Sequence, residues 1–385
     1  MCLFYPLLSK VSFISGYTIL VYLFVLCSSI HSLFFNFIRA KGYVRLSAFD
    51  GISSTILTII LNVLFLVVFH MGITGYVLGT ILADVISSLF LFTIAKLYRY
   101  ISIKSVEKET AAIMLKYCIP LIPTTVCSWV INISDRYLIS HFINTSMTGL
   151  YSVANKIPTI LLIVANIFGD AWQISAVTES DKNARRQFFS NVSNVYVSVA
   201  FLTGSFLIMS AKFITKLLAS PSFYTAWQFI PILVMATTFA CLSQFLGSVY
   251  MIGRKSFATL INTSIGAGLN IGLNLILIPY FAAKSPYLGV QAAAFSTFMS
   301  YFSMFAIKAF HTRRYIKIRW NMPKLMLDSV LITLQCYIMV TEVRYWPIYE
   351  TLLFIAAFVL NIDDVWKAFV KILPASLRKK LKLSN

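Results

Sequence analysis

The chain has 385 residues, of which 59% are hydrophobic and 12% are charged, and its mean hydropathy is +0.81. A soluble domain of this length could not hide so much apolar surface in one or two cores, so a soluble globular fold is excluded. The 32 Lys and Arg residues against 13 Asp and Glu give a net charge of +19, which anionic membrane lipid can accept without a nucleic-acid partner.

Runs of mostly apolar residues recur eleven times, each near the length of about 20 residues that a helix needs to cross a bilayer. They are too long for strands and lack dyad alternation, and lipid offers the backbone no hydrogen-bond partners. We therefore predict an all-α polytopic membrane protein with helices near residues 11–35, 48–70, 73–96, 117–141, 148–172, 189–210, 227–251, 257–281, 287–310, 325–341 and 347–362.

Basic residues concentrate in alternate connections between these runs. Of the 32 Lys and Arg residues, 25 fall in one set of loops, which includes the C-terminal tail. Because cytoplasmic loops are enriched in Lys and Arg, we expect the C-terminus in the cytoplasm and, with an odd number of spans, the N-terminus outside. No cleavable signal with a basic start and a small-residue cleavage site precedes the first run, so we expect a segment to be missing upstream.

The fourth and fifth runs carry charges where lipid disfavours them. Asp135 and Arg136 lie in the outer part of the fourth run, and Asn155, Lys156 and Pro158 follow in the fifth. A lone charge near the bilayer centre costs roughly 2.5 to 3.5 kcal/mol. Pro158 should kink its helix just before Lys156, as in helices that face a wet cavity. The alternative for Arg136 is an anchor at the membrane interface, with Asp135 as its local partner.

Polar residues in two other places each have two interpretations. Asp170, near the inner end of the fifth run, is either a functional acid or a residue at the cytoplasmic boundary. In the eighth run, Asn262, Gly266, Asn270 and Asn274 recur at steps of four, so they share one helix face. That face is either a small-residue packing ridge held by interhelical amide bonds or a polar stripe along a transport path.

Signatures of enzymes and of bound metals are absent from the sequence. The four His residues are scattered, no H-E-x-x-H, Walker A or G-x-G-x-x-G string occurs, and the six Cys lack C-x-x-C spacing. We expect no enzyme, no cofactor and no metal site. A polysaccharide polymerase would need a substantial outer loop, whereas the longest outer connection covers only residues 211–226.

Four short motifs follow one another between residues 117 and 180. They are Pro-Leu-x-Pro from Pro120, Asp-Arg-Tyr from Asp135, Gly-x-Tyr-Ser from Gly149, and Ala-Trp from Ala171, before a basic loop. As an ordered set, they resemble the middle of the Wzx-type polysaccharide (O-antigen) flippases, within the multidrug/oligosaccharidyl-lipid/polysaccharide exporter superfamily.

The resemblance implies twelve or fourteen helices in two pseudo-symmetric bundles of six, with the Pro-Leu-x-Pro helix opening the second bundle. Only three runs precede that helix here, so we expect a chain that lacks the first three helices of such a protein. The expected domains are the remainder of the N-terminal bundle at 1–110, a six-helix bundle at 111–315, and an extra helical hairpin with a basic cytoplasmic tail at 316–385.

The function that the resemblance implies is translocation of an undecaprenyl-pyrophosphate-linked oligosaccharide, an O-antigen or capsule repeat unit, across the bacterial cytoplasmic membrane. Two bundles would rock to give alternating access, with proton or sodium coupling. Membrane lipid, the lipid-linked substrate, a polysaccharide polymerase and chain-length proteins are the implied partners. The expected substrate-binding residues are Arg136, Lys156, Asn155, Asn270 and Asn274, and the expected ion-coupling residues are Asp135 and Asp170.

Three alternatives stay open from the sequence. A drug or cation antiporter of the same superfamily should prefer acidic to basic cavity residues, and the mid-span Lys156 argues against it. A flippase for the peptidoglycan precursor is chemically close to the first interpretation. An inactive remnant is the third alternative, because half of one bundle would be absent.

Overall fold

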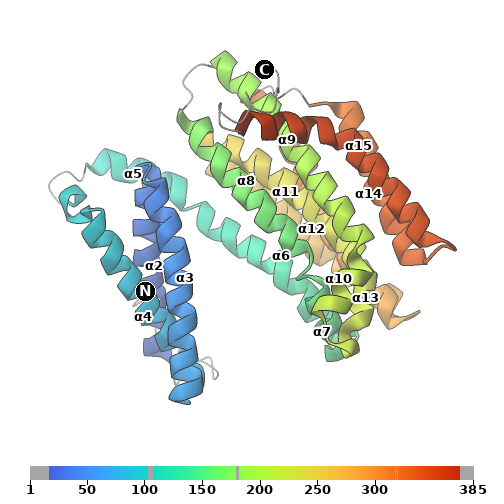
Figure 1. Cartoon of the computed structure of the whole chain (residues 1–385), viewed down its shortest axis with the longest axis horizontal. Coiled ribbons are helices and arrows are strands. Elements are labelled where there is room, and N and C mark those ends of the chain that lie inside the picture. The colour runs from blue at the N-terminus through green and yellow to red at the C-terminus, as the bar shows by residue number, and fades with distance from the viewer. Residues whose placement is uncertain (1–16, 103–106, 179–181, 317, 319, 373–385) are drawn as a thin grey trace. The chain divides into compact units, whose positions relative to one another are not determined.

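The structure is a computed structural model that describes residues 17–102, 107–178, 182–316, 318 and 320–372 (Figure 1). Within helices, the side chains of 168, 170–186, 188, 368, 369, 371 and 372 lie outside the described part. Every regular element in the described ranges is helical, and ten helical segments there are long and apolar enough to cross a membrane. The predicted all-α polytopic fold is thereby confirmed.

The chain divides into two compact units, residues 1–110 and 111–385. In the first unit, α4 packs against both α2 and α3. Glycine makes the α3–α4 contact close, because a Cβ at Gly79 would lie 2.5 Å from Oδ1 of Asn62. The helical elements assigned to this unit are α2 (Thr18–Ala40), α3 (Val44–Val63), the π-helical turn η2 (Leu64–Val68), α4 (Gly72–Ile94) and η3 (Leu97–Tyr100).

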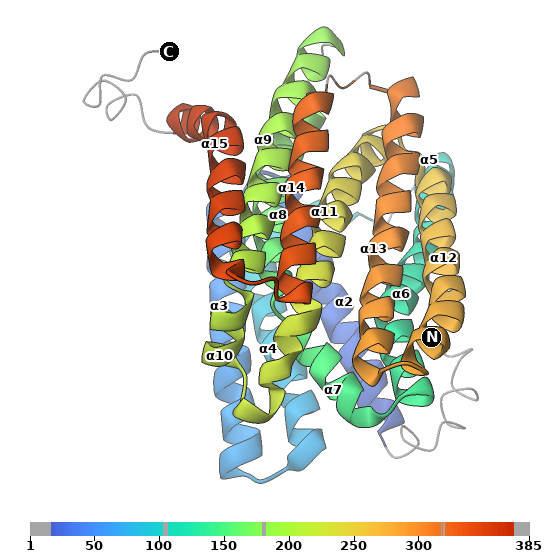
Figure 2. The same cartoon turned by 90° about the vertical axis from the view of Figure 1, so that its right-hand side faces the viewer.

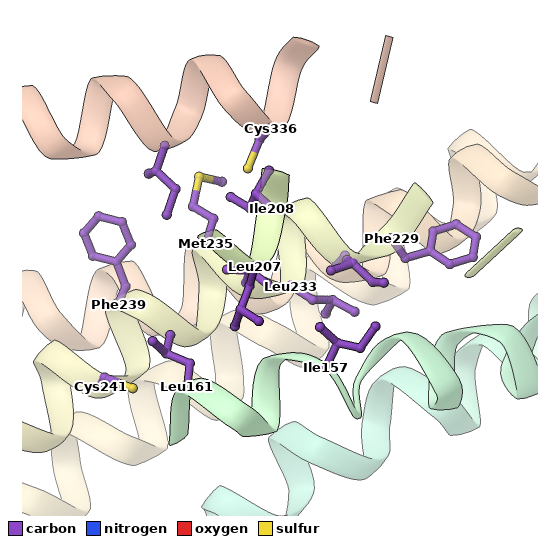
Figure 3. Close-up of a cluster of buried hydrophobic side chains, with 14 of the residues drawn as sticks. Ile157, Leu161, Leu207, Ile208, Phe229, Leu233, Met235, Phe239, Cys241 and Cys336 are labelled. Carbon is purple, nitrogen blue, oxygen red and sulfur yellow. The ribbon is translucent and has the colours of Figure 1, made fainter. Parts of the chain in front are cut away.

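The second unit is built around one deeply buried helix, α11, which packs against α8, α9, α13 and α14. Figure 3 shows apolar side chains from several helices converging there, among them Leu233, Met235 and Phe239 of α11. The first half of this unit consists of α5 (Lys108–Cys118), α6 (Leu121–Phe142), α7 (Thr145–Ala154), α8 (Pro158–Thr178), α9 (Lys182–Met209) and α10 (Ala211–Leu218). The second half consists of η5 (Pro221–Phe229), α11 (Ile230–Ile252), α12 (Ser256–Ala282), α13 (Pro286–His311), η6 (Thr312–Arg314), α14 (Met322–Thr341) and α15 (Trp346–Ile372).

The predicted apolar runs correspond to these helices with local changes. The first run begins in residues outside the description, and its helix α2 extends to Ala40. The fifth run is interrupted between Ala154 and Pro158, as its proline predicts, and Lys156 N there bonds Val153 O in a tighter turn. The eleventh run lies in α15, which is not among the ten candidate spans.

The last two helices, α14 and α15, pack on each other and on α9 (Figure 2). Near the α14–α15 connection, Lys212 of α10 lies between two indole rings, 4.0 Å from the centroid of Trp227 and 4.2 Å from that of Trp346. Lys212 also forms an ion pair with Glu342. Cation–π contacts to two rings on different elements join this end of the hairpin to the rest of the second unit.

Candidate functional site

A buried carboxylate in α6 is the centre of the polar site in the second unit. The side chain of Asp135 is only 3% exposed and accepts four hydrogen bonds. Its Oδ1 accepts from Nδ2 of Asn270, at 3.1 Å, and from Nδ2 of Asn274, at 2.6 Å. Its Oδ2 accepts from the Tyr151 hydroxyl and from the Thr297 hydroxyl, each at 2.6 Å. Four helices, α6, α7, α12 and α13, therefore meet at one carboxyl group.

Close packing of α12 on α13 brings two of these helices together. A Cβ at Gly266 would lie 2.4 Å from the sulfur of Met304, and the Ser300 hydroxyl donates to the Gly266 carbonyl at 2.7 Å. One turn further along α12, Nδ2 of Asn270 is 3.1 Å from the Thr297 hydroxyl of α13. The absence of a side chain at residue 266 thus allows the approach that the Asp135 contacts require.

Hydrogen-bond donors, rather than a cation, surround the Asp135 carboxylate. Among the described side chains, no Lys, Arg or His forms an ion pair with it. Burying a charge without a counter-charge is costly, and donated hydrogen bonds offset only part of that cost. A carboxylate in these surroundings has the chemistry to take up a proton or a small cation.

The amides beside Asp135 can serve either ligand. The Asn274 Oδ1 atom is buried and has no hydrogen-bond partner. Rotating a side-chain amide by half a turn exchanges its NH2 donor for its oxygen acceptor. With the amides turned, the site would present carboxylate, amide and hydroxyl oxygens, which hard cations prefer as ligands.

A cavity of about 140 Å³ lies beside this carboxyl group. Its lining includes Asp135 and Arg136 of α6, Asn155 and Pro158 at the interruption between α7 and α8, and Thr237 of α11. A water molecule takes up about 30 Å³ of liquid volume, and pockets for drug-sized ligands hold about 300 to 1,000 Å³. In this conformation the cavity therefore has room for a hydrated ion, and it would have to widen to admit a sugar head group.

The structure gathers some of the predicted site residues and separates others. Asn270 and Asn274 are buried, and both donate hydrogen bonds to Asp135. They do not line the cavity. Arg136 is exposed and does line it, as does the half-buried Asn155, whose Nδ2 donates to the Tyr151 carbonyl at 3.1 Å.

The two remaining candidates stand apart from this group. Lys156 is exposed at the helix interruption and does not line the cavity. The side chain of Asp170 lies outside the described part of the structure.

Two residues of the Asp135 site were not identified from the sequence. Tyr151 stands in the Gly-x-Tyr-Ser motif, which marks the segment but not the role of the hydroxyl. Thr297 lies in an apolar run of α13 and has no local pattern around it. Only the pairing of α6 with α13 could have identified it.

The first unit has a polar group of its own. His31 of α2 lies between two acids, with Nε2 3.0 Å from Asp50 Oδ2 and Nδ1 3.4 Å from Asp84 Oδ1. The Ser28 hydroxyl also donates to Asp84. The ring thus lies within hydrogen-bond reach of both carboxyl groups, one at each nitrogen. The scattered His residues gave no indication of this group in the sequence.

A larger, basic cavity of about 710 Å³ lies at one end of the first unit. Arg45, Lys96 and Arg99 line it together with Tyr43 and Tyr100. Lysine and arginine bind phosphate and carboxylate groups through charge-assisted hydrogen bonds. The cavity is therefore suited to an anion.

No protein-family model and no curated protein sequence matches the chain. Solved structures do share its fold. An outward-facing multidrug resistance MATE family transporter of the MOP superfamily has a TM-score of 0.63 at 13% identity, covering 82% of this chain and 72% of that one. A mutant of the Vibrio cholerae MATE transporter VcmN has a TM-score of 0.64 at 13% identity, covering 79% and 70%. The lipid II flippase MurJ, inward closed, has a TM-score of 0.56 at 15% identity, covering 91% and 72%.

The fold defined by the helices and by these similarities is that of MOP-superfamily transporters. The chain is accordingly a multi-pass membrane protein with ten candidate spans in its described part.

Proposed function

We propose that the chain is an ion-coupled flippase for an undecaprenyl-pyrophosphate-linked oligosaccharide, the repeat unit of an O-antigen or capsule, in the bacterial cytoplasmic membrane. The observation that carries the proposal is the Asp135 site, a buried acid that opens through a small cavity to Arg136. A head group of sugars and pyrophosphate cannot cross hydrocarbon alone, so it needs a polar path and an energy source.

The residues of the site divide between two tasks in this proposal. Asp135 binds the coupling proton or sodium ion, and Asn270 and Asn274 hold its carboxylate in place. Arg136 and Lys156, both exposed, compensate the phosphate charge, Arg by paired hydrogen bonds and Lys as a point charge. Since Asn270 and Asn274 are buried and bonded to Asp135, the sugar hydroxyls are bound by Asn155 and by other residues.

An anionic substrate has independent support in the first unit. The cavity lined by Arg45, Lys96 and Arg99 offers three cations, whereas an exporter of cationic drugs gains nothing from such groups. MurJ, described as a lipid II flippase, has the same fold. A lipid-linked pyrophosphate therefore suits the chain better than a cationic drug does.

The test replaces the two proposed phosphate ligands separately. In cells that depend on this chain for surface polysaccharide, we expect Arg136→Ala and Lys156→Ala each to reduce surface polysaccharide severalfold and to raise the amount of unflipped lipid-linked oligosaccharide. Membrane insertion should stay normal, because both side chains are exposed. The matched control is Lys216→Ala, which removes an exposed cation from α10, away from the site.

Normal polysaccharide in both variants would refute the phosphate roles. Wild-type chain that restores growth to cells lacking a lipid II flippase, but restores no surface polysaccharide, would assign the peptidoglycan precursor as substrate instead. A wild-type chain without activity in either assay would contradict the proposed function itself.

A further inference from the structure

A second layer of buried polar groups lies between α9, α14 and α15, away from the cavity beside Asp135. On α14, Asp328 lies four residues and Gln335 eleven residues after Lys324, so the three share one helix face. On α15 the spacing of eleven residues from Glu350 to Asn361 does the same. The two faces pack against each other and against α9.

The first acid–amide pair in this layer is Asp328 with Asn361. Asp328 is 1% exposed and Asn361 is fully buried. Nδ2 of Asn361 donates to Oδ1 of Asp328 at 2.7 Å and to the Ala357 carbonyl at 2.9 Å. The other two polar atoms of the pair, Asp328 Oδ2 and Asn361 Oδ1, are buried and have no hydrogen-bond partner.

The second pair, Gln335 with Glu350, repeats this pattern. Both residues are fully buried, and Nε2 of Gln335 donates to Oε2 of Glu350 at 3.1 Å and weakly to the Ser205 carbonyl at 3.5 Å. Again the remaining two oxygens, Gln335 Oε1 and Glu350 Oε1, are buried without a partner. Each of the two pairs thus leaves one carboxyl oxygen and one amide oxygen without a hydrogen bond.

A proton can supply that missing hydrogen bond. A carboxylate oxygen and an amide oxygen are both acceptors only, so neither can satisfy the other. A carboxylic acid, in contrast, donates through its O–H, and it forms a cyclic pair with an amide, in which N–H bonds one carboxyl oxygen and O–H bonds the amide oxygen. One added proton per pair would therefore give both unpartnered oxygens a hydrogen bond.

We propose that Asp328 and Glu350 each bind one proton, and that the layer between α9, α14 and α15 is a proton-binding site of this protein. Each step converts a carboxylate and a proton to a carboxylic acid, with no other bond made or broken. The layer is separate from the Asp135 site, so this inference does not depend on the substrate proposed above.

The charged groups facing the two acids support this assignment. In the described structure, the cation nearest in sequence to Asp328 is Lys324, one turn away, and its Nζ bonds Asp364 Oδ2 at 2.6 Å and the Ser198 hydroxyl at 2.7 Å. Lys324 is thus already committed to a third acid of the layer. Asp328 and Glu350 form no ion pair among the described residues.

The other helices that pack on the two acids bring no further cation into hydrogen-bond contact with them. The described contacts of α9 in this layer are hydroxyl and carbonyl groups, from Ser198 and Ser205. Beside Glu350, the Cys336 thiol of α14 donates to the Pro231 carbonyl of α11 at 3.2 Å. Two ionised acids here would be buried negative charges with no ion-pair partner among the described residues, which is costly in a membrane.

The experiment is infrared difference spectroscopy on the full chain in lipid nanodiscs at neutral pH. We expect the wild-type minus Asp328→Asn spectrum to contain the C=O band of one protonated carboxylic acid, which shifts in heavy water. Wild type minus Glu350→Gln should contain a second such band, and the double variant should lose both. The matched control is Asp364→Asn, whose difference spectrum should show an ionised carboxylate band, because this acid is paired with Lys324.

Loss of carboxylate bands, rather than carboxylic acid bands, in the Asp328 and Glu350 variants would overturn the proposal. If an isosteric variant fails to fold, Asn361→Ala and Gln335→Ala keep the acids and remove their partners. The C=O band of each acid should then shift to higher frequency, since a hydrogen bond is lost. An unshifted band in both variants would also overturn the proposal.

Discussion

The Thr297 hydroxyl shows how much one side chain can matter at the Asp135 site. It donates to the carboxylate at 2.6 Å and also accepts from Asn270 at 3.1 Å, so it joins two members of the site. Hydrogen bonds to a charged group contribute about 1.5 to 3 kcal/mol, and a buried acceptor left unpaired is costly. The hydroxyl is therefore a structural and an electrostatic part of the site.

We predict that Thr297→Val destabilises the protein by about 1 to 3 kcal/mol, because it keeps the shape of the side chain but removes this donor. Thermal unfolding in detergent measures the change. The matched control is Thr237→Val, because Thr237 lines the same cavity but its hydroxyl donates only to its own helix, at the Leu233 carbonyl. Equal stability of the two variants would show that the Thr297 contact contributes nothing.

Sequence patterns identify the members of this site unequally. Asp135 stands out because an acid is rare in a membrane span, and Asn270 with Asn274 stand out through their steps of four. Thr297 and Tyr151 are ordinary residues in a helix until the fold brings them to Asp135. A residue in a membrane span indicates a site only when it is costly to bury there. A Thr or Tyr hydroxyl is not, and a Thr hydroxyl can bond the backbone of its own helix.

At the scale of single elements, the polar face of α12 makes the interhelical amide bonds of a packing ridge, and its interpretation as a transport path stays a prediction. Its Gly266 packs closely on α13, and Nδ2 of Asn262 donates to the Met304 carbonyl at 3.1 Å, as in a packing ridge. Further along the same face, Asn270 and Asn274 hold the Asp135 carboxylate. Periodicity predicted the shared face, but it could not predict that the face meets a different partner at each end.

We predict that Gly266→Ala destabilises the protein by about 1 to 3 kcal/mol, because the added methyl group displaces the Met304 side chain from its packing against α12. The added Cβ would lie 2.4 Å from the Met304 sulfur. Gly272→Ala in the same helix is the control, since nothing lies within 4 Å of a Cβ there, and it should be neutral or stabilising by up to about 1 kcal/mol. The unfolding midpoints of the two variants measure the change; a Gly266→Ala protein as stable as the wild type would show that the packing of Met304 against α12 contributes nothing.

At the scale of the whole molecule, the charge asymmetry predicts an orientation that can be tested at the two ends of α12. Lys255 precedes this helix and belongs to the basic set of loops, whereas Lys284 follows it in the other set. The positive-inside rule then places Lys255 in the cytoplasm and Lys284 outside.

We predict that a membrane-impermeant thiol reagent labels Lys284→Cys in intact cells and labels Lys255→Cys only after the cells are permeabilised. The background is a chain whose six native cysteines are replaced. Labelling of both variants in permeabilised cells is the control for accessibility. The reverse pattern in intact cells would invert the topology and place the C-terminus outside.

The helices of the molecule were easier to predict from the sequence than the buried polar contacts between them. Hydropathy gave the helices, because a membrane span requires a long apolar run. The interruption before Pro158 was also predictable, because proline removes a helix hydrogen bond. The acid–amide pairs of α14 and α15 were not, since no sequence pattern shows that Asn361 lies beside Asp328.

The order in which the chain is made has a consequence for Asp135. Tyr151 leaves the ribosome 16 residues after this acid, but Asn270 and Thr297 follow only 135 and 162 residues later. At a synthesis rate of about 5 to 20 residues per second, α6 waits roughly 8 to 32 s until Thr297 has been made. During that interval the α6–α7 pair carries a carboxyl group with one of its four hydrogen-bond donors in place, so we expect α6 to stay shielded from lipid until α13 arrives.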